Sequence, residues 1–209
     1  RWGAAGETIG VVPTMGALHD GHLSLVAAAK AGCDRVIVTI FVNPKQFNQA
    51  SDLDKYPRTE EADARKLERF AVDAIYAPDL SQIYPEGFCT NVSVTGMTDV
   101  LCGAHRPGHF DGVGTIVEAL LRLILPQRAY FGEKDFQQLM IIRRMAEDLD
   151  FPVAVLGLPT VREDDGLAMS SRNVYLDATE RAQAPVLFSA LREIEDGLRD
   201  GQRDYAQLE

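Results

Sequence analysis

The amino-acid sequence predicts an α/β protein with a Rossmann-like parallel sheet and helices on both faces. Short apolar runs rich in Val and Ile alternate along the chain with longer segments that carry apolar residues at helical spacing. This alternation is typical of βαβ units, whose right-handed crossovers place successive strands in one parallel sheet. The run at residues 36–42 is almost entirely apolar, as expected of a strand that helices cover on both faces.

The first expected strand, residues 9–13, is followed by a helix that stops at Gly32. The apolar face of this helix is predicted to consist of Leu23, Val26, Ala27 and Ala31. The elements expected next are the strand at 36–42, a polar loop at 43–58, a charged helix at 59–70 and a strand at 72–77.

The middle of the chain is expected to continue the alternation. Residues 90–94 alternate like a strand, and residues 112–125 resemble a buried helix that ends before Pro126. Strands at 128–131 and 153–158 then bracket a helix at 136–149, whose apolar face is predicted to consist of Leu139, Ile142, Ala146 and Leu149. Beyond Asp177 the pattern predicts one long polar helix with Gly197 and Gly201 near its end.

The domain organisation is expected to change near residues 173–177. Residues 1–175 are predicted to form the Rossmann-like domain, and residues 176–209 the start of a smaller carboxyl-terminal domain that is largely absent. Because the chain starts at Arg1 and its charged helical pattern still runs at Leu208 and Glu209, we expect that one or both ends are missing.

Composition excludes several classes of protein. The chain has 21 Lys and Arg against 31 Asp and Glu, a net charge of −10, which disfavours nucleic-acid binding. The longest strand-like apolar run spans residues 36–42, far short of the roughly 18 residues needed to cross a bilayer. Three irregularly spaced cysteines fit a reducing compartment, so the cytoplasm is the expected location.

Four segments carry side chains suited to chemistry, and the first is residues 13–22. His19 and His22 stand three residues apart at the start of a helix, where free backbone N–H groups and the helix dipole favour an anion. Gly16 and Gly21 allow a ligand to approach the backbone closely. The strand–Gly–helix setting favours a phosphate site over a loop with two solvated histidines.

The second and third segments also follow predicted strands. In residues 41–47, Asn43 and Gln46 offer neutral donors and acceptors for a small substrate, although an ordinary Asn-Pro turn is the simpler alternative. In residues 131–138, Lys134 can meet phosphate oxygens, Asp135 can cap a helix or hold a ribose hydroxyl, and Gln138 lies on the same side. A solvated helix start is the alternative there.

The fourth segment is residues 161–172. Gly166 can act as a hinge, and Ser170, Ser171 and Arg172 present hydroxyls and a guanidinium that can clamp a polyphosphate. A plain polar loop is the alternative. Because ligands of open α/β sheets bind outside the carboxyl ends of the strands, segments that follow strands are expected to share one site.

Two further patterns carry little weight. The run GVGTIV at 112–117 lacks the third small residue of a dinucleotide fingerprint and follows no clear strand. Cys102, His105 and His109 have metal-like spacing without a standard set of four ligands, so no protein-held metal is expected. No Gly-Lys-Ser/Thr sequence is present, which excludes a P-loop enzyme.

Residues 13–22 resemble the histidine signature of the nucleotidyltransferase superfamily, which includes class I aminoacyl-tRNA synthetases. Five more sequences resemble the pantoate–β-alanine ligase family: FVNPKQF at 41–47, YPRT at 56–59, RPGHF at 106–110, FGEKDFQQ at 131–138 and DGLAMSSRN at 165–173. The resemblance runs in order from about Val11 to about Arg181. One departure is Lys45, which stands where many members carry Met.

The resemblance implies an AMP-forming ligase that makes a C–N bond. Pantoate would attack the α-phosphate of ATP, whose Mg²⁺ is held mainly by the phosphates, and β-alanine would then displace AMP to give pantothenate. A homodimer is expected from the resemblance alone, with small-molecule substrates and neither nucleic acid nor membrane as partner.

The resemblance also assigns residues. His22, as the proton donor, His19 and Lys134 would be catalytic. Gln46 and Gln138 would bind pantoate, and Gln46 would also place β-alanine. His109 and Tyr56 would line the site. The ATP-binding residues would be Met15, Gly16, Ala17, Leu18, His19, Asp20, Gly21, His22, Gly132, Glu133, Lys134, Asp135, Val161, Met169, Ser170, Ser171 and Arg172.

Two other functions remain open from the sequence. The first is a ligand-binding module that keeps the fold without catalysis, which would bind ATP without releasing pyrophosphate. The second is another nucleotidyltransferase or a synthetase fragment, whose tRNA partner would need a basic surface that a net charge of −10 disfavours.

Overall fold

The computed structural model describes residues 2–204 and 206, and five strands of this part form one sheet in the order β3-β2-β1-β4-β5. Every neighbouring pair is parallel. The strands are β1 (Ile9–Thr14), β2 (Arg35–Ile40), β3 (Ala74–Tyr76), β4 (Arg128–Gly132) and β5 (Ala154–Leu158). Along the chain, β2 and β3 are added in turn on one side of β1, and β4 and β5 are then added on its other side. The predicted fold class is confirmed.

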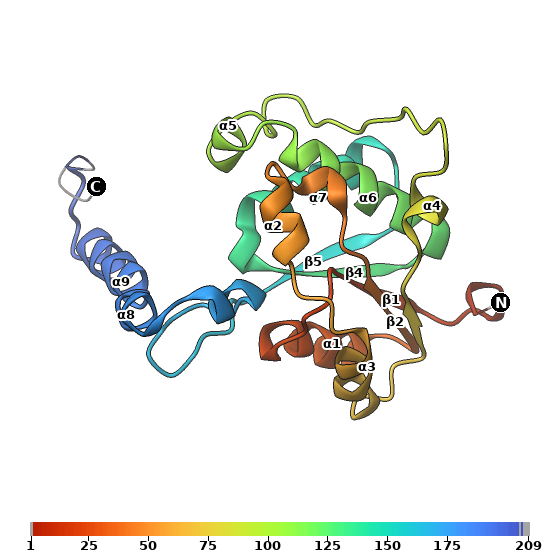
Figure 1. Cartoon of the computed structure of the whole chain (residues 1–209), viewed down its shortest axis with the longest axis horizontal. Coiled ribbons are helices and arrows are strands. Elements are labelled where there is room, and N and C mark those ends of the chain that lie inside the picture. Colours follow the sequence, from red (N-terminus) through yellow and green to blue (C-terminus); the bar gives the residue numbers. More distant parts are fainter. Residues whose placement is uncertain (1, 205, 207–209) are drawn as a thin grey trace.

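Helices cover both faces of the sheet (Figure 1). Helices α1 and α3 lie on one face, α6 and α7 lie on the other, and α8 and α9 extend to the side of the sheet. The helices are α1 (Asp20–Gly32), α2 (Ala50–Lys55), α3 (Glu60–Glu68), α4 (Leu80–Ile83), α5 (Cys102–His105), α6 (His109–Ile124), α7 (Phe136–Asp148), α8 (Ala178–Gln183) and α9 (Val186–Arg199). Short 3₁₀ turns include η2 (Pro44–Gln46), η3 (Glu133–Asp135) and η4 (Ser171–Tyr175).

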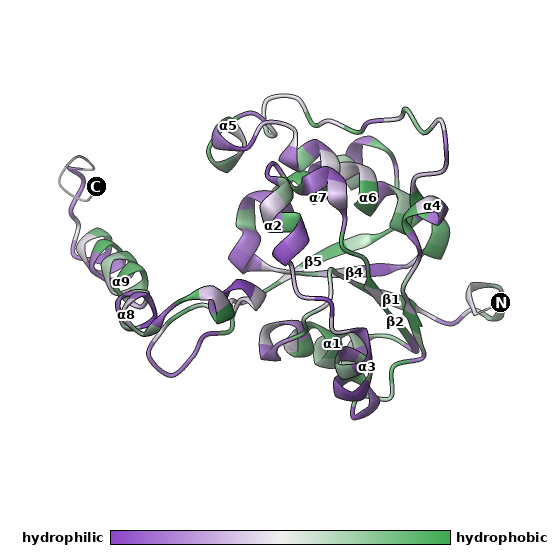
Figure 2. Ribbon diagram, viewed as in Figure 1, coloured by the Kyte–Doolittle hydropathy of each residue, from purple (hydrophilic) through white to green (hydrophobic). Residues whose placement is uncertain are grey.

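The hydrophobic core has two layers because successive strand residues point to opposite faces. Val11 packs among residues of α6 and α7, whereas its neighbour Val12 packs among residues of α1 and Leu67 of α3. Both valines are fully buried. Figure 2 shows the consequence, with hydrophobic residues on β1 and β2 and largely hydrophilic residues on α3.

The predicted strand at residues 90–94 is wrong, because this segment is irregular. The Val92 N–H donates to the Thr115 side chain of α6 at 3.0 Å instead of joining the sheet. Val92 and Val94 pack into the core cluster that α6 and α7 share. The alternating apolar residues therefore reflect packing against a helix, and α6 itself begins at His109, three residues before the predicted start.

Two other segments also differ from expectation. The predicted polar loop at 43–58 contains η2 and α2. The predicted long helix beyond Asp177 is two helices, α8 and α9, with Pro185 between them, because proline has no N–H to continue the helical ladder. The end of that prediction, Leu208 and Glu209, lies outside the described residues. None of the described helices is long and apolar enough to cross a membrane.

The buried faces of two predicted helices are shifted in part. In α1 the buried residues are Leu23, Leu25, Val26 and Ala29, whereas Ala27 and Ala31 are exposed. In α7, Leu139, Ile142 and Ala146 are buried as expected, but Leu149 follows the helix and is exposed. In both cases the predicted spacing is helical, and the contact with the sheet selects which positions are buried.

Candidate active site

The site lies at the carboxyl ends of β1 and β4, where the strand order reverses. The connections after β1 and β4 leave these neighbouring strands toward opposite edges, which opens a crevice at their carboxyl ends. A cavity of about 240 Å³ lies there. The predicted site residues that line it are Met15, His19, Gly21, His22, Gln46, Gly132, Lys134, Asp135, Gln138, Val161, Met169, Ser170, Ser171 and Arg172. The four segments therefore meet in one place, with His109 and Tyr56 beside them.

The structure places five of the predicted ATP residues outside the cavity lining: Gly16, Ala17, Leu18, Asp20 and Glu133. The backbone N–H groups of Ala17 and Leu18 donate to Asp63. The Asp20 carboxylate is exposed and lies 3.6 Å from Arg69. Glu133 is also exposed.

His19 and His22 stand together at the start of α1, with ring centroids 4.1 Å apart. His22 Nδ1 accepts from the His19 backbone N–H at 3.4 Å, so the ring proton of His22 belongs on Nε2. Gly21 makes room for this arrangement, because a Cβ there would lie 2.9 Å from the His19 ring. His19 Nδ1 is buried without a partner among the described residues.

Both histidines are neutral near pH 7. Burial lowers the pKa of His22 to about 3, and the neighbouring His19, Lys134 and Lys66 contribute to that lowering of the pKa. Burial and Lys134 also lower the pKa of His19. A neutral imidazole can donate a hydrogen bond from its N–H, but it is a poor source of a transferable proton at this pH.

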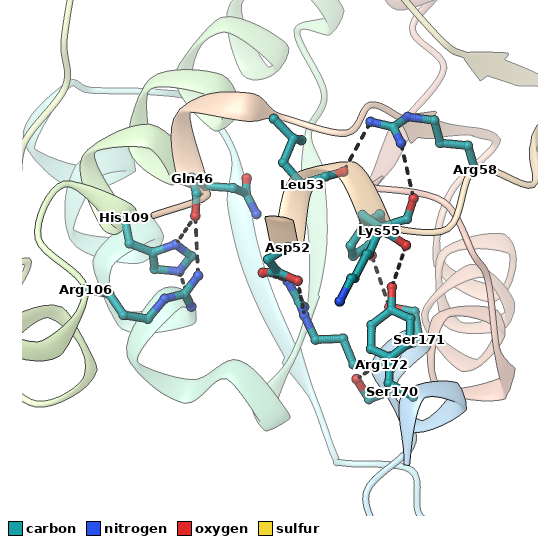
Figure 3. A network of polar contacts seen from close by, with 12 residues as sticks. Gln46, Asp52, Leu53, Lys55, Arg58, Arg106, His109, Ser170, Ser171 and Arg172 are labelled. Atoms are coloured by element: carbon teal, nitrogen blue, oxygen red, sulfur yellow. Dashed lines mark hydrogen bonds and ion pairs between the residues drawn. The ribbon is translucent and has the colours of Figure 1, made fainter. Parts of the chain in front are cut away.

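Gln46 is held through its backbone carbonyl and its side-chain oxygen, which leaves its side-chain NH₂ group for a ligand. The Gln46 carbonyl oxygen accepts from His109 Nδ1 at 2.7 Å and from Arg106 at 3.3 Å, as Figure 3 shows. Its side-chain oxygen accepts from Asn43 at 3.0 Å, which leaves the amide NH₂ as a donor. Helix α6 approaches this turn at Gly112, where any Cβ would collide with the backbone of Lys45.

Asn43 and Lys45 both make structural contacts, although Asn43 also lines the cavity. Asn43 is 1% exposed, accepts from the Tyr84 hydroxyl at 2.8 Å and donates to the Gly112 carbonyl at 3.0 Å. The Lys45 ammonium lies over the rings of Tyr84 and Phe88, 4.8 and 4.5 Å from their centroids. The departure at Lys45 thus lies beside the site and outside the cavity lining.

The cavity suits anionic substrates. Its described lining includes the cationic side chains of Arg106, Lys134 and Arg172, and Asp135 is its only carboxylate. Arg172 also contacts Asp52 (Figure 3). The Tyr56 hydroxyl lies 3.1 Å from Ser171 Oγ.

Sequence reasoning missed Arg106, Asp52 and Asp63. Of these three residues, only Arg106 could have been found from the sequence, because it is the first residue of the family-like RPGHF sequence. His109, part of the metal-like spacing, uses both ring nitrogens within the site: Nδ1 donates to Gln46, and Nε2 accepts from Arg106 at 3.2 Å.

Comparisons with known proteins agree with one another. A family model described as Pantoate-beta-alanine ligase matches residues 1–209. The chain is 71% identical over 201 residues to a pantothenate synthetase of Roseobacter denitrificans, covering 96% of this chain and 71% of that protein. A pantothenate synthetase structure from Thermus thermophilus is 52% identical with a TM-score of 0.94. The match covers 97% of this chain and 74% of that one. A pantoate-β-alanine ligase structure from Francisella tularensis, complexed with beta-gamma ATP and beta-alanine, is 39% identical with a TM-score of 0.82. The match covers 96% of this chain and 74% of that one.

Proposed function

The chain belongs to the pantoate–β-alanine ligase family, and from that premise we propose how its residues divide the ATP-dependent condensation of pantoate with β-alanine. The observation that carries the proposal is the shared cavity. It joins a histidine pair at a helix start and the cationic side chains of Lys134 and Arg172 to the neutral side chains of Gln46 and Gln138. The cationic and N–H-bearing groups therefore suit phosphates, and the neutral amides suit the hydroxyls and carboxylate of pantoate.

In the first step, a pantoate carboxylate oxygen attacks the α-phosphorus of ATP. A new P–O bond forms and the bond to pyrophosphate breaks, so negative charge grows on the phosphate oxygens. Lys134 and Arg172 offset this charge, and Ser170 and Ser171 donate hydrogen bonds to it. Such a displacement depends on positioning and electrostatic stabilisation more than on covalent catalysis by the protein.

His22 and His19 act in this step as neutral hydrogen-bond donors. With Nδ1 of His22 accepting from the His19 backbone, Nε2–H is the group that can meet an α-phosphate oxygen. The low pKa of His22 makes hydrogen-bond donation the better role than proton transfer. The N–H groups and dipole at the start of α1 add to the same stabilisation.

Gln46 and Gln138 hold pantoate, and Gln46 also places β-alanine for the second step. There the β-alanine amine attacks the acyl carbon of pantoyl adenylate and the new C–N bond forms. The nitrogen loses a proton to solvent, and AMP leaves with the pair of electrons of the C–O bond. His109 and Arg106 act through Gln46, because both hold its backbone carbonyl.

Mg²⁺ enters with ATP and is held mainly by the phosphates, since Asp135 is the only carboxylate of the described lining. We also propose a homodimer, a cytoplasmic location, and a domain division between residues 175 and 176.

The test is isotope exchange between pyrophosphate and ATP. We expect exchange that depends on pantoate and does not respond to amino acids, followed by pantothenate formation when β-alanine is added. ATP binding without any exchange would instead favour a binding module. Exchange that depends on an amino acid would favour another nucleotidyltransferase.

A further inference from the structure

The turn that leads from β1 to the histidine pair has an unusual backbone. Gly16 has a φ of 82° and Ala17 has a φ of 50°, so two successive residues are left-handed. Glycine adopts this conformation readily, but alanine meets a steric penalty there. Surrounding contacts must hold a turn of this kind in place.

Those contacts converge on Asp63, a residue of α3 that is completely buried. Asp63 Oδ2 accepts from the Ala17 N–H and Oδ1 accepts from the Leu18 N–H, both at 2.8 Å. The Thr59 hydroxyl donates to Oδ2 at 3.0 Å. No ion pair involving Asp63 is found among the described residues, so these neutral donors are what compensate the buried carboxylate.

Helix α3 also holds the other side of the same residue. Lys66 lies one helical turn after Asp63, and its ammonium donates to the Leu18 carbonyl at 2.5 Å. Gly16 packs directly against this arrangement, because a Cβ there would lie 3.2 Å from Asp63 Oδ2. Both the N–H and the carbonyl of Leu18 are therefore held by one helix face.

The next residue after Leu18 is His19, which stands at the start of α1. We propose that Asp63 is a positioning residue for adenylate formation: its carboxylate holds the left-handed turn so that His19 and His22 face the phosphates of ATP. This inference rests on the proposed roles of the two histidines. Asp63 itself lies outside the cavity lining, so it acts through the turn and not on substrate.

The variant Asp63→Asn tests this role. It keeps the size of the side chain but replaces one acceptor with an NH₂ group that faces a backbone N–H. We expect kcat for pantoate-dependent ATP–pyrophosphate exchange to fall about 10- to 100-fold, the loss that a small misplacement of catalytic groups causes. The KM for pantoate should change less than about twofold, because Gln46 and Gln138 stand on other elements.

Asp73→Asn is the matched control. Asp73 also accepts from a backbone N–H, that of Val36 at 2.9 Å, and it pairs with Lys30 and Arg35. It directly precedes β3, at the amino ends of the strands, whereas the cavity lies at their carboxyl ends. Loss of this carboxylate should lower the melting temperature and leave the exchange rate unchanged.

A spectroscopic measurement separates positioning from general destabilisation. In the intact chain burial, followed by the charges of His19, Lys134 and Lys66, lowers the pKa of His22 to about 3. If Asp63→Asn releases the turn, the NMR titration of His22 should shift toward the ordinary value for an exposed imidazole. The same titration in Asp73→Asn should match the parent chain.

The possible outcomes are distinct. If His22→Ala retains the full exchange rate, the proposed function of the histidines is wrong. If His22→Ala is slow while Asp63→Asn keeps both its kcat and its His22 titration, the inference about Asp63 is overturned. Should Asp63→Asn fail to fold, Thr59→Val removes only the hydroxyl donor and should lower kcat about threefold. An unchanged kcat in that variant would also overturn the inference.

Discussion

The Arg172 guanidinium lies against the Asp52 carboxylate, with Nε 3.3 Å from Oδ1 and Nη2 3.0 Å from Oδ2 (Figure 3). The guanidinium carbon also lies 5.3 Å from the centroid of the Tyr56 ring and 5.8 Å from that of Phe47. Arg172 is thus oriented by one carboxylate and by two aromatic rings at the edge of the cavity. The Asp52 carboxylate would therefore compete with the phosphates of ATP for the positive charge of Arg172.

The first prediction follows from this competition. Asp52→Asn should lower the KM for ATP about threefold, because it removes a negative charge while the two rings keep Arg172 in place. Arg172→Ala should raise the KM for ATP by about tenfold or more. Since both side chains of the pair are about a third or more exposed, Asp52→Asn should cost less than about 1 kcal/mol of stability. A higher KM for ATP in Asp52→Asn would show that the carboxylate assists Arg172.

The second prediction concerns the histidine pair. His22→Ala should lower pantoate-dependent ATP–pyrophosphate exchange by about 10²–10³, the effect of losing one preorganised donor, and His19→Ala should have a similar effect. The exposed His105, which stands outside the cavity lining, supplies the control. His105→Ala should retain the parent rate. Near-full exchange in His22→Ala would remove this residue from the mechanism.

The third prediction concerns stability in acid. Burial lowers the pKa of His22 to about 3 and also lowers the pKa values of His19 and His109. Between about pH 6.5 and pH 3 the unfolded chain therefore binds more protons than the native chain, and stability falls as the pH falls. His22 alone should contribute a loss of roughly 2 kcal/mol between about pH 7 and pH 5.

Urea unfolding of the parent chain and of His22→Gln at both pH values measures this contribution. The carboxylates common to both chains cancel in the comparison, so the variant should lose less stability than the parent on acidification. Equal losses in the two chains would mean that folding does not lower the pKa of His22.

The fourth prediction concerns which residues of the cavity bind pantoate and which bind ATP. Gln46→Ala and Gln138→Ala should weaken the use of pantoate by about 10- to 100-fold, because removal of one partner leaves polar groups unpaired at roughly 1–3 kcal/mol each. ATP affinity should stay nearly unchanged. Gln127→Ala is the control, since Gln127 accepts from the Ile9 N–H at the amino end of β1. A parallel loss of ATP affinity in the two site variants would contradict the division.

The sequence by itself determined the α/β fold and the four segments of the site. Residues 36–42 had to be buried because they are almost entirely apolar, and the alternation with helices required a parallel sheet. In such a sheet the carboxyl ends of the strands share one edge. His22, Gln46 and Lys134 each follow a strand, so their meeting in one cavity was predictable without coordinates.

Only the tertiary structure decided how neighbouring polar residues are used. Asn43 and Gln46 are alike in chemistry, yet burial between η2 and α6 commits Asn43 to structural hydrogen bonds and leaves Gln46 a free amide donor. The contacts of Asp63 with Leu18 and of Asp52 with Arg172 join residues far apart in sequence, where no local pattern marks a partner. The low pKa of His22 likewise comes from burial. These properties depend on which surfaces pack together, and packing is set by the whole fold.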